Sequence, residues 1–225
     1  MIVPGLATAA LLLAGLTVSQ ERVAFPTADG GVVHADVYGQ GDRGVVLAHG
    51  GRFTKESWAG QAPVLADSGF RVVAIDFRGR GESRGPPEAD GDDEAYRFDV
   101  LAAVTYLRDS GATSVSVVGG SFGGWASALA AIEAPPGQID RIVLLASSAV
   151  DEPEELKGRK LFITSRGDTT GSGALRLVSI QEQYERAPDP KELVVLEGAA
   201  HAQFIFETDQ GQRLMDEILR FLSAP

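Results

Sequence analysis

The hydrophobic pattern alternates between short apolar runs and longer stretches of helical period. Gly44–Ala48 and Arg71–Phe77 are continuous apolar runs, as expected of strands buried on both faces. In Tyr96–Asp109 and Asp209–Leu222, apolar residues recur three or four positions apart, which predicts amphipathic helices. Strands that alternate with helices are typical of a sheet of parallel strands.

The other predicted elements extend this alternation. The first two strands, Arg22–Thr27 and Val32–Tyr38, are joined by the turn sequence Ala28–Gly31, which predicts a hairpin. Further strands are predicted at Ser114–Val118, Arg141–Ala146, Lys160–Thr164 and Leu193–Leu196, and further helices at Ser57–Ser68, Trp125–Ala134 and Leu175–Glu185. We therefore expect residues 21–225 to form a single three-layer α/β domain, with a mostly parallel central sheet and helices on both faces.

The N-terminal segment, residues 1–20, has two interpretations. Ile2–Val18 contains no charged side chain, and the small residues Thr17 and Ser19 fit a cleavage site, which favours a secretory signal or a membrane anchor. No Lys or Arg precedes Arg22, and the run is short for a membrane-spanning helix, which favours a segment packed on the domain. Localisation is open between export and the cytoplasm, and we expect no stable membrane span beyond this segment.

Composition excludes several kinds of chemistry. The formal net charge of −11 makes the chain a poor ligand for the phosphates of nucleic acid. Cysteine is absent, which excludes disulfides, a thiol nucleophile and cysteine–zinc sites. Only three histidines, His34, His49 and His201, are available for acid–base chemistry. We expect no metal and no organic cofactor, and the composition leaves the oligomeric state open.

A candidate nucleophile follows the strand predicted at Ser114–Val118. Gly119–Gly123 reads G-G-S-F-G and lies directly before a predicted helix, the context that a G-x-S-x-G turn requires. The glycines allow the backbone and the helix to approach closely, and the serine stands on a sharp turn. This context favours Ser121 as a nucleophile over a simple glycine-rich turn.

A candidate oxyanion site follows the strand ending at Ala48. The loop reads His49-Gly50-Gly51-Arg52, and a backbone N–H from it, together with that of Phe122, would bind a developing negative charge. Gly51 is the first choice for this donor and Arg52 the second. His49 itself fits a hydrogen-bonded structural residue better than a base.

A late acid and a late histidine complete a candidate triad. Asp168 follows the strand ending at Thr164, and His201 follows the last predicted strand. A serine needs a base within hydrogen-bond reach, and that base needs an acceptor to orient it. His34 lies on the opening hairpin, so His201 is the favoured base. Asp151 is the rival acid, but the loop position of Asp168 favours the latter.

These motifs together resemble the α/β-hydrolases from about Arg22 to the C-terminus. The matching pieces are HGG at His49–Gly51, DFRGRGES at Asp76–Ser83, GGSFGG at Gly119–Gly124, SRGD at Ser165–Asp168 and GAAHAQF at Gly198–Phe204. The resemblance implies a structural role for Asp76. Many members insert a helical cap before the strand that leads to the acid. Here the corresponding connection, Ala149–Arg159, holds at most a short helical turn, so we expect no cap domain.

The expected function is that of a serine hydrolase that cleaves small carboxylic esters through an acyl-enzyme. The alternatives are a peptidase or thioesterase of the same fold, or a non-catalytic protein that binds a small ligand. Residues expected to contact substrate are Arg52, Phe53, Trp125 and Phe204. The acidic loop Pro86–Glu94 and several arginines lie on the same predicted face, so the local charge there is open.

Overall fold

The structure is a computed structural model that describes residues 20–87, 94–147 and 150–225. Residues 1–19 of the apolar N-terminal segment and residues 88–93 of the acidic loop lie outside the described residues, and so do the expectations that concern them. Among the helices that are described, none has the length and apolar character needed to cross a bilayer.

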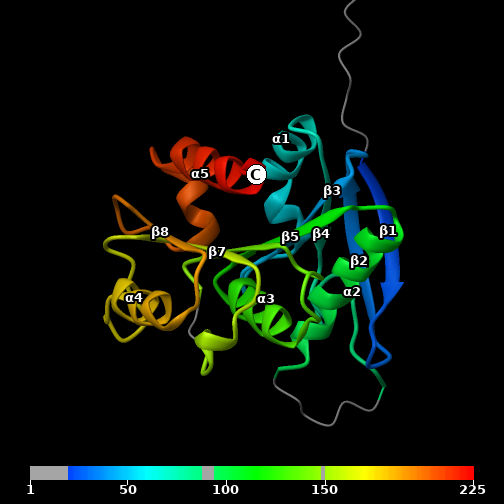
Figure 1. The fold of residues 1–225 in the computed structure, drawn as a ribbon, viewed down its shortest axis with the longest axis horizontal. Helices are drawn as coiled ribbons and strands as arrows, with labels where there is room; N and C mark the ends of the chain where they lie inside the picture. The colour runs from blue at the N-terminus through cyan, green and yellow to red at the C-terminus, as the bar shows by residue number, and fades with distance from the viewer. Residues whose placement is uncertain (1–19, 88–93, 148–149) are drawn as a thin grey trace, which may run out of the picture.

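One eight-stranded sheet runs through the molecule (Figure 1). Its strand order is β1-β2-β4-β3-β5-β6-β7-β8. β1 pairs antiparallel with β2, β2 pairs antiparallel with β4, and every other neighbouring pair is parallel. The strands are β1 (Gln20–Pro26), β2 (Val32–Tyr38), β3 (Arg43–Ala48), β4 (Phe70–Ile75), β5 (Ser114–Gly120), β6 (Arg141–Leu145), β7 (Arg159–Ser165) and β8 (Lys191–Leu196).

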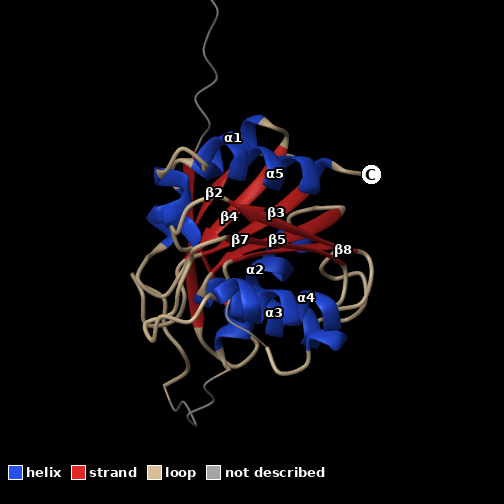
Figure 2. Cartoon of the chain, turned by 90° about the vertical axis from the view of Figure 1, so that its left-hand side faces the viewer, coloured by secondary structure: helices blue, strands red, loops and turns tan. Residues whose placement is uncertain are grey.

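Helices cover both faces of this sheet. Figure 2 shows α1 and α5 on one face and α2, α3 and α4 on the other. The α-helices are α1 (Gln61–Asp67), α2 (Tyr96–Asp109), α3 (Phe122–Glu133), α4 (Arg176–Arg186) and α5 (Gly211–Ser223), and the short 3-10 helices are η1 (Lys55–Trp58), η2 (Pro153–Glu155) and η3 (Ala202–Glu207). The predicted three-layer α/β fold is confirmed.

Two apolar cores explain why the inner strands read as continuous apolar runs. Along β3, Val45 and Leu47 join the core under α1 and α5, while Val46 and Ala48 join the core under α2, α3 and α4. Side chains of a strand alternate between its faces, so a strand covered on both sides requires apolar residues at every position.

The prediction of one helix over Ser57–Ser68 is wrong, because the segment divides into η1 and α1. Pro63 is the physical reason. A proline inside a helix lacks the N–H of the helical ladder and collides with the carbonyl four residues earlier, whereas the first turn of α1 tolerates it. A second difference is that α3 begins at Phe122, directly after Ser121, rather than at Trp125.

The connection between β6 and β7 is short. Among its described residues, the only helical piece is η2 (Pro153–Glu155). The parallel strands β3, β5, β7 and β8 all end on one edge of the sheet, and loops that follow them contain the candidate chemistry.

Candidate active site

Ser121 lies at a strained turn between β5 and α3. Its φ of 52° and ψ of −117° are values that non-glycine residues rarely adopt. Two neighbouring glycines make the turn sterically feasible. A Cβ on Gly119 would meet the carbonyl oxygen of Gly123 at 2.4 Å, and a Cβ on Gly123 would meet that of Ala48 at 2.3 Å. The turn therefore holds the serine side chain away from the sheet, at the N-terminus of α3.

The structure brings the three predicted triad residues into one hydrogen-bonded chain. Ser121 Oγ lies 2.7 Å from His201 Nε2, and His201 Nδ1 lies 2.6 Å from Asp168 Oδ2. The Asp168 side chain is 2% exposed and that of His201 is 28% exposed. The outer nitrogen of the imidazole thus faces the serine near solvent, while the inner nitrogen faces a buried carboxylate.

Asp168 is held by its own loop and by α4. Its backbone N–H donates to the carbonyl of Ser165, and its carbonyl accepts from the N–H of Arg176. The Arg176 side chain also forms an ion pair with Asp168 Oδ1 at 3.5 Å. The rival acid, Asp151, is exposed and lines a separate cavity beside Trp125, so the structure places Asp168 rather than Asp151 against His201.

The loop after β3 places Gly51 beside Phe122. A Cβ built on Gly51 would lie 3.6 Å from the Cβ of Phe122. The neighbouring N–H of Gly50 is already used, because it donates to Gln203 Oε1 at 2.7 Å. Within the described part of the chain, no acceptor is bound to the N–H of Gly51. The N–H of Phe122 belongs to the first turn of α3, where amides have no partner within the helix. Gly51 and Arg52 are both exposed, so exposure does not separate them, and Gly51 as the oxyanion donor stays a prediction.

Sequence reasoning missed Gln203, two residues after His201. Its side chain is buried, and its Nε2 donates to Ser57 Oγ at 2.6 Å. A Cβ on Gly120 would meet Gln203 Oε1 at 2.9 Å, so the amide packs directly on the strand that leads to Ser121. The only hint in the sequence was a polar residue inside the motif GAAHAQF.

His49 has the structural role expected of it. Its ring is 1% exposed, and its Nε2 accepts a hydrogen bond from the N–H of Phe77 at 3.2 Å. The other ring nitrogen, Nδ1, donates to the carbonyl of Gly50 at 2.8 Å. Burial lowers the pKa of His49 and favours the neutral ring. The remaining histidine, His34, lies on β2, 3.4 Å from a carboxylate oxygen of Glu82.

Asp76 holds the segment that follows the loop at Gly51. Its buried carboxylate accepts from both the backbone N–H and the Nζ of Lys55, at 2.8 and 2.9 Å. Although burial lowers the pKa of Lys55, hydrogen bonds to Glu56 and Asp76 raise it to about 12. The ammonium group therefore remains charged, which keeps the buried carboxylate paired.

The predicted substrate-contacting aromatic residues belong to two different ring contacts. Phe53 and Phe204 pack together with ring centroids 5.0 Å apart, and Phe204 is partly exposed on η3. Trp125 lies on α3 with its ring 5.6 Å from that of Phe122. Whether these residues contact a substrate stays a prediction.

A family model described as "alpha/beta hydrolase fold" matches residues 44–165. This span includes the turn at Ser121 and the loop at Gly51. The chain belongs to the alpha/beta hydrolase fold family. Family membership agrees with the sheet order and with the position of the strained serine between β5 and α3.

Relatives of this alpha/beta hydrolase have different activities. It is 30% identical over 173 residues to a protein from Rattus norvegicus described as a putative protein-lysine deacylase, ABHD14B, an alignment that covers 74% of this chain and 78% of the relative. It is also 42% identical over 82 residues to bifunctional epoxide hydrolase 2 from Sus scrofa, covering 36% of this chain. That alignment spans only 14% of the length of the epoxide hydrolase.

Solved structures agree with the fold. An esterase from Pyrococcus furiosus superposes with a TM-score of 0.72 at 19% identity, covering 100% of this chain and 98% of the esterase. At this identity the likeness concerns the fold alone.

Proposed function

We propose that this alpha/beta hydrolase is a serine hydrolase that cleaves carboxylic esters through an acyl-enzyme intermediate. The observation that supports the proposal best is the unbroken hydrogen-bonded chain from Ser121 to His201 to Asp168, with distances of 2.7 and 2.6 Å. Serine, imidazole and carboxylate in this order form an activated nucleophile, because the imidazole accepts the hydroxyl proton as the serine attacks.

Acylation uses each of these groups at a definite atom. Ser121 Oγ attacks the ester carbonyl carbon while His201 Nε2 takes the hydroxyl proton. Asp168 keeps the other proton on His201 Nδ1 and stabilises the imidazolium that forms. The N–H groups of Gly51 and Phe122 bind the oxygen that becomes negatively charged. When the tetrahedral intermediate collapses, the alcohol leaves with the proton that His201 returns.

Deacylation repeats the same steps with water. The oxygen of a water molecule attacks the acyl-serine while His201 takes a proton from that water. When the bond between the acyl group and Ser121 Oγ breaks, His201 gives the proton to Ser121 Oγ, so the acid is released and the serine hydroxyl is restored. No group beyond the chain and water is needed for the balance of atoms and charge. The short β6–β7 connection supports an open cleft, which suits small, accessible esters.

A covalent probe and one substitution test this proposal. We expect a fluorophosphonate to label the protein and p-nitrophenyl butyrate to be hydrolysed. Ser121→Ala should abolish labelling and lower kcat/KM by about 10⁴-fold or more, since the members of a triad act as a unit. Ser179→Ala, an exposed serine on α4, is the matched control. Full turnover by Ser121→Ala would rule the mechanism out.

A second candidate is the hydrolysis of acyl-lysine amides by the same groups. It is favoured by the relative described as a putative protein-lysine deacylase, which aligns over most of both chains. An amide needs a protonated leaving nitrogen, a task that His201 Nε2 performs in the same position. Comparing kcat/KM for butyryl esters, thioesters and Nε-butyryl-lysine peptides separates these activities. Inertness toward all of them and toward the fluorophosphonate would favour a ligand-binding protein instead.

A further inference from the structure

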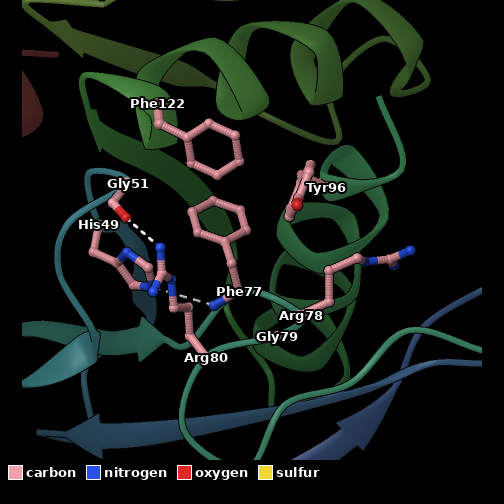
Figure 3. A pocket seen from close by; sticks show the side chains of 8 residues that line it. All are labelled: His49, Gly51, Phe77, Arg78, Gly79, Arg80, Tyr96 and Phe122. Carbon is pink, nitrogen blue, oxygen red and sulfur yellow. Dashed lines mark hydrogen bonds between the residues drawn. The ribbon is translucent and has the colours of Figure 1, made fainter. Parts of the chain in front are cut away.

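A cavity of about 310 Å³ opens beside the two proposed oxyanion amides. Figure 3 shows its lining, which comprises His49, Gly51, Phe77, Arg78, Gly79, Arg80, Tyr96 and Phe122. Three of these rings meet edge to face, with the centroid of Phe122 4.7 Å from that of Tyr96 and 5.2 Å from that of Phe77. The wall is therefore aromatic, and the volume is at the small end of the range for ligand sites.

Two arginines line this cavity, and one of them is neutralised. Arg78 donates to Asp29 Oδ2 at 2.6 Å and to Asp99 Oδ1 at 2.8 Å. Although burial lowers the pKa of Arg78, its hydrogen bonds to both carboxylates raise it well above its ordinary value. With two carboxylates against one guanidinium, Arg78 offers no net positive charge to a ligand.

Arg80 is held differently. Its Nη2 donates to the carbonyl oxygen of Gly51 at 2.5 Å, a contact drawn in Figure 3. Among the described residues, no carboxylate forms an ion pair with Arg80. A guanidinium has five N–H donors, so the hydrogen bond to Gly51 leaves other donors of Arg80 for a ligand. Among the described residues, Arg80 is therefore a cation without a carboxylate partner, and it lines an aromatic cavity beside the proposed oxyanion donor Gly51.

In the proposed reaction, the lining of this cavity fits the acyl part of an ester better than the leaving alcohol. The leaving alcohol must contact His201 Nε2, which returns its proton, and neither His201 nor Ser121 is among the residues that line this cavity. The cavity instead includes Gly51 and Phe122, whose N–H groups face the carbonyl oxygen in the proposed mechanism. The chain attached to the carbonyl carbon is the part of an ester that would extend into this space.

We propose that Arg80 is a specificity-determining residue that binds a carboxylate at the end of the acyl chain. The preferred substrates are then half-esters of short dicarboxylic acids, with their methylene groups against Phe77 and Phe122. This proposal rests on the proposed ester hydrolysis. The net charge of −11 does not oppose it, because distant charges are screened beyond about 8 Å, whereas a direct guanidinium–carboxylate contact is not.

The test compares two esters of equal acyl length. We expect the wild type to hydrolyse p-nitrophenyl hydrogen glutarate with a higher kcat/KM than p-nitrophenyl valerate. Arg80→Gln should lower the ratio of these two values by about tenfold, the loss of one charged hydrogen bond of about 1.4 kcal/mol. Arg80→Lys should retain part of the ratio, because it keeps the charge but not the forked geometry. Arg84→Gln, an exposed arginine of the same loop outside the cavity, should leave the ratio unchanged.

The outcomes separate this proposal from the proposed function. If Arg80→Gln lowers kcat/KM equally for both esters, Arg80 only positions Gly51 and the specificity proposal is wrong, while ester hydrolysis stands. If the wild type hydrolyses neither ester, calorimetry of monomethyl glutarate binding to Ser121→Ala and to Ser121→Ala/Arg80→Gln decides the question. Weaker binding to the double variant supports the carboxylate site, and equal or absent binding overturns it.

Discussion

Gln203 Oε1 accepts a hydrogen bond of 2.7 Å from the backbone N–H of Gly50, which ties the loop of His201 to the loop of Gly51. The other end of the amide donates to Ser57 Oγ, whose own hydroxyl donates to the carbonyl of Thr54. The donor at Gly50 requires the amide oxygen on its side, and the acceptor at Ser57 requires the amide nitrogen on the other side, so the two together fix the orientation of the Gln203 amide. Because the side chain of Gln203 forms its hydrogen bonds with Gly50 and Ser57 and not with Ser121 or His201, we regard it as a positioning residue.

Replacing Gln203 should weaken catalysis without removing the nucleophile. Gln203→Met keeps the shape but leaves the N–H of Gly50 unsatisfied, which costs about 1–3 kcal/mol of unfolding free energy. We expect kcat to fall by about tenfold with little change in KM, and slower but complete fluorophosphonate labelling. Gln212→Met, on the exposed side of α5, is the control. Unchanged kcat at reduced stability would show that Gln203 is structural only.

The identity of the triad acid can be tested by two matched substitutions. Asp168→Asn removes the acceptor 2.6 Å from His201 Nδ1, so the ring no longer holds the required tautomer. We expect kcat to fall by about 10³- to 10⁴-fold with the fold retained. Asp151→Asn, in the loop after β6, should keep nearly full activity. The reverse pattern would transfer the role to Asp151.

Gly123 should not accept even one methyl group. In Gly123→Ala, the new Cβ would meet the carbonyl oxygens of Ala48 and His49 at 2.3 and 2.5 Å, and both belong to backbone that cannot rotate away. We expect a loss of about 1–3 kcal/mol in urea unfolding, together with lower activity as the loop at Gly51 shifts.

The matched control for this substitution is Gly60→Ala. At Gly60 a Cβ meets nothing within 4 Å and φ is −81°, so the alanine should be neutral or slightly stabilising. Equal stability of the two alanine variants would contradict the packing argument.

The buried ring of His49 predicts a pH dependence of stability. Burial lowers its pKa in the folded state below the ordinary value of 6.5. The unfolded chain therefore binds the proton more readily, and the free energy of unfolding falls as pH drops below about 6.5 toward the folded pKa. The maximum slope is about 1.4 kcal/mol per pH unit.

Urea unfolding between pH 5 and 7.5 measures this contribution. His49→Asn should be less stable than the wild type at every pH. Its free energy of unfolding should fall less steeply as pH drops, because the contribution of His49 is missing. Gly60→Ala, which removes no titratable group, should retain the wild-type slope. Identical slopes in the wild type and His49→Asn would exclude His49 as the titrating group.

Much of the fold could be predicted because its determinants are local. The apolar runs of the inner strands and the period of α2 follow from side-chain alternation and helical spacing, and α2 matches its predicted bounds, Tyr96–Asp109. The hairpin of β1 and β2 followed from its turn sequence. The broken helix at Pro63 also had a local cause, which the apolar spacing alone concealed.

The sequence by itself determined the alternation of strands and helices, the strained turn at Ser121 and the chain order of Ser121, Asp168 and His201. Only the tertiary structure decided which acid faces His201, because the distance between loops depends on the order β5-β6-β7-β8 and not on spacing in the chain. It alone revealed Gln203 beside Gly50 and Arg80 against Gly51. These contacts join residues 153 and 29 positions apart, and no local pattern records such pairs.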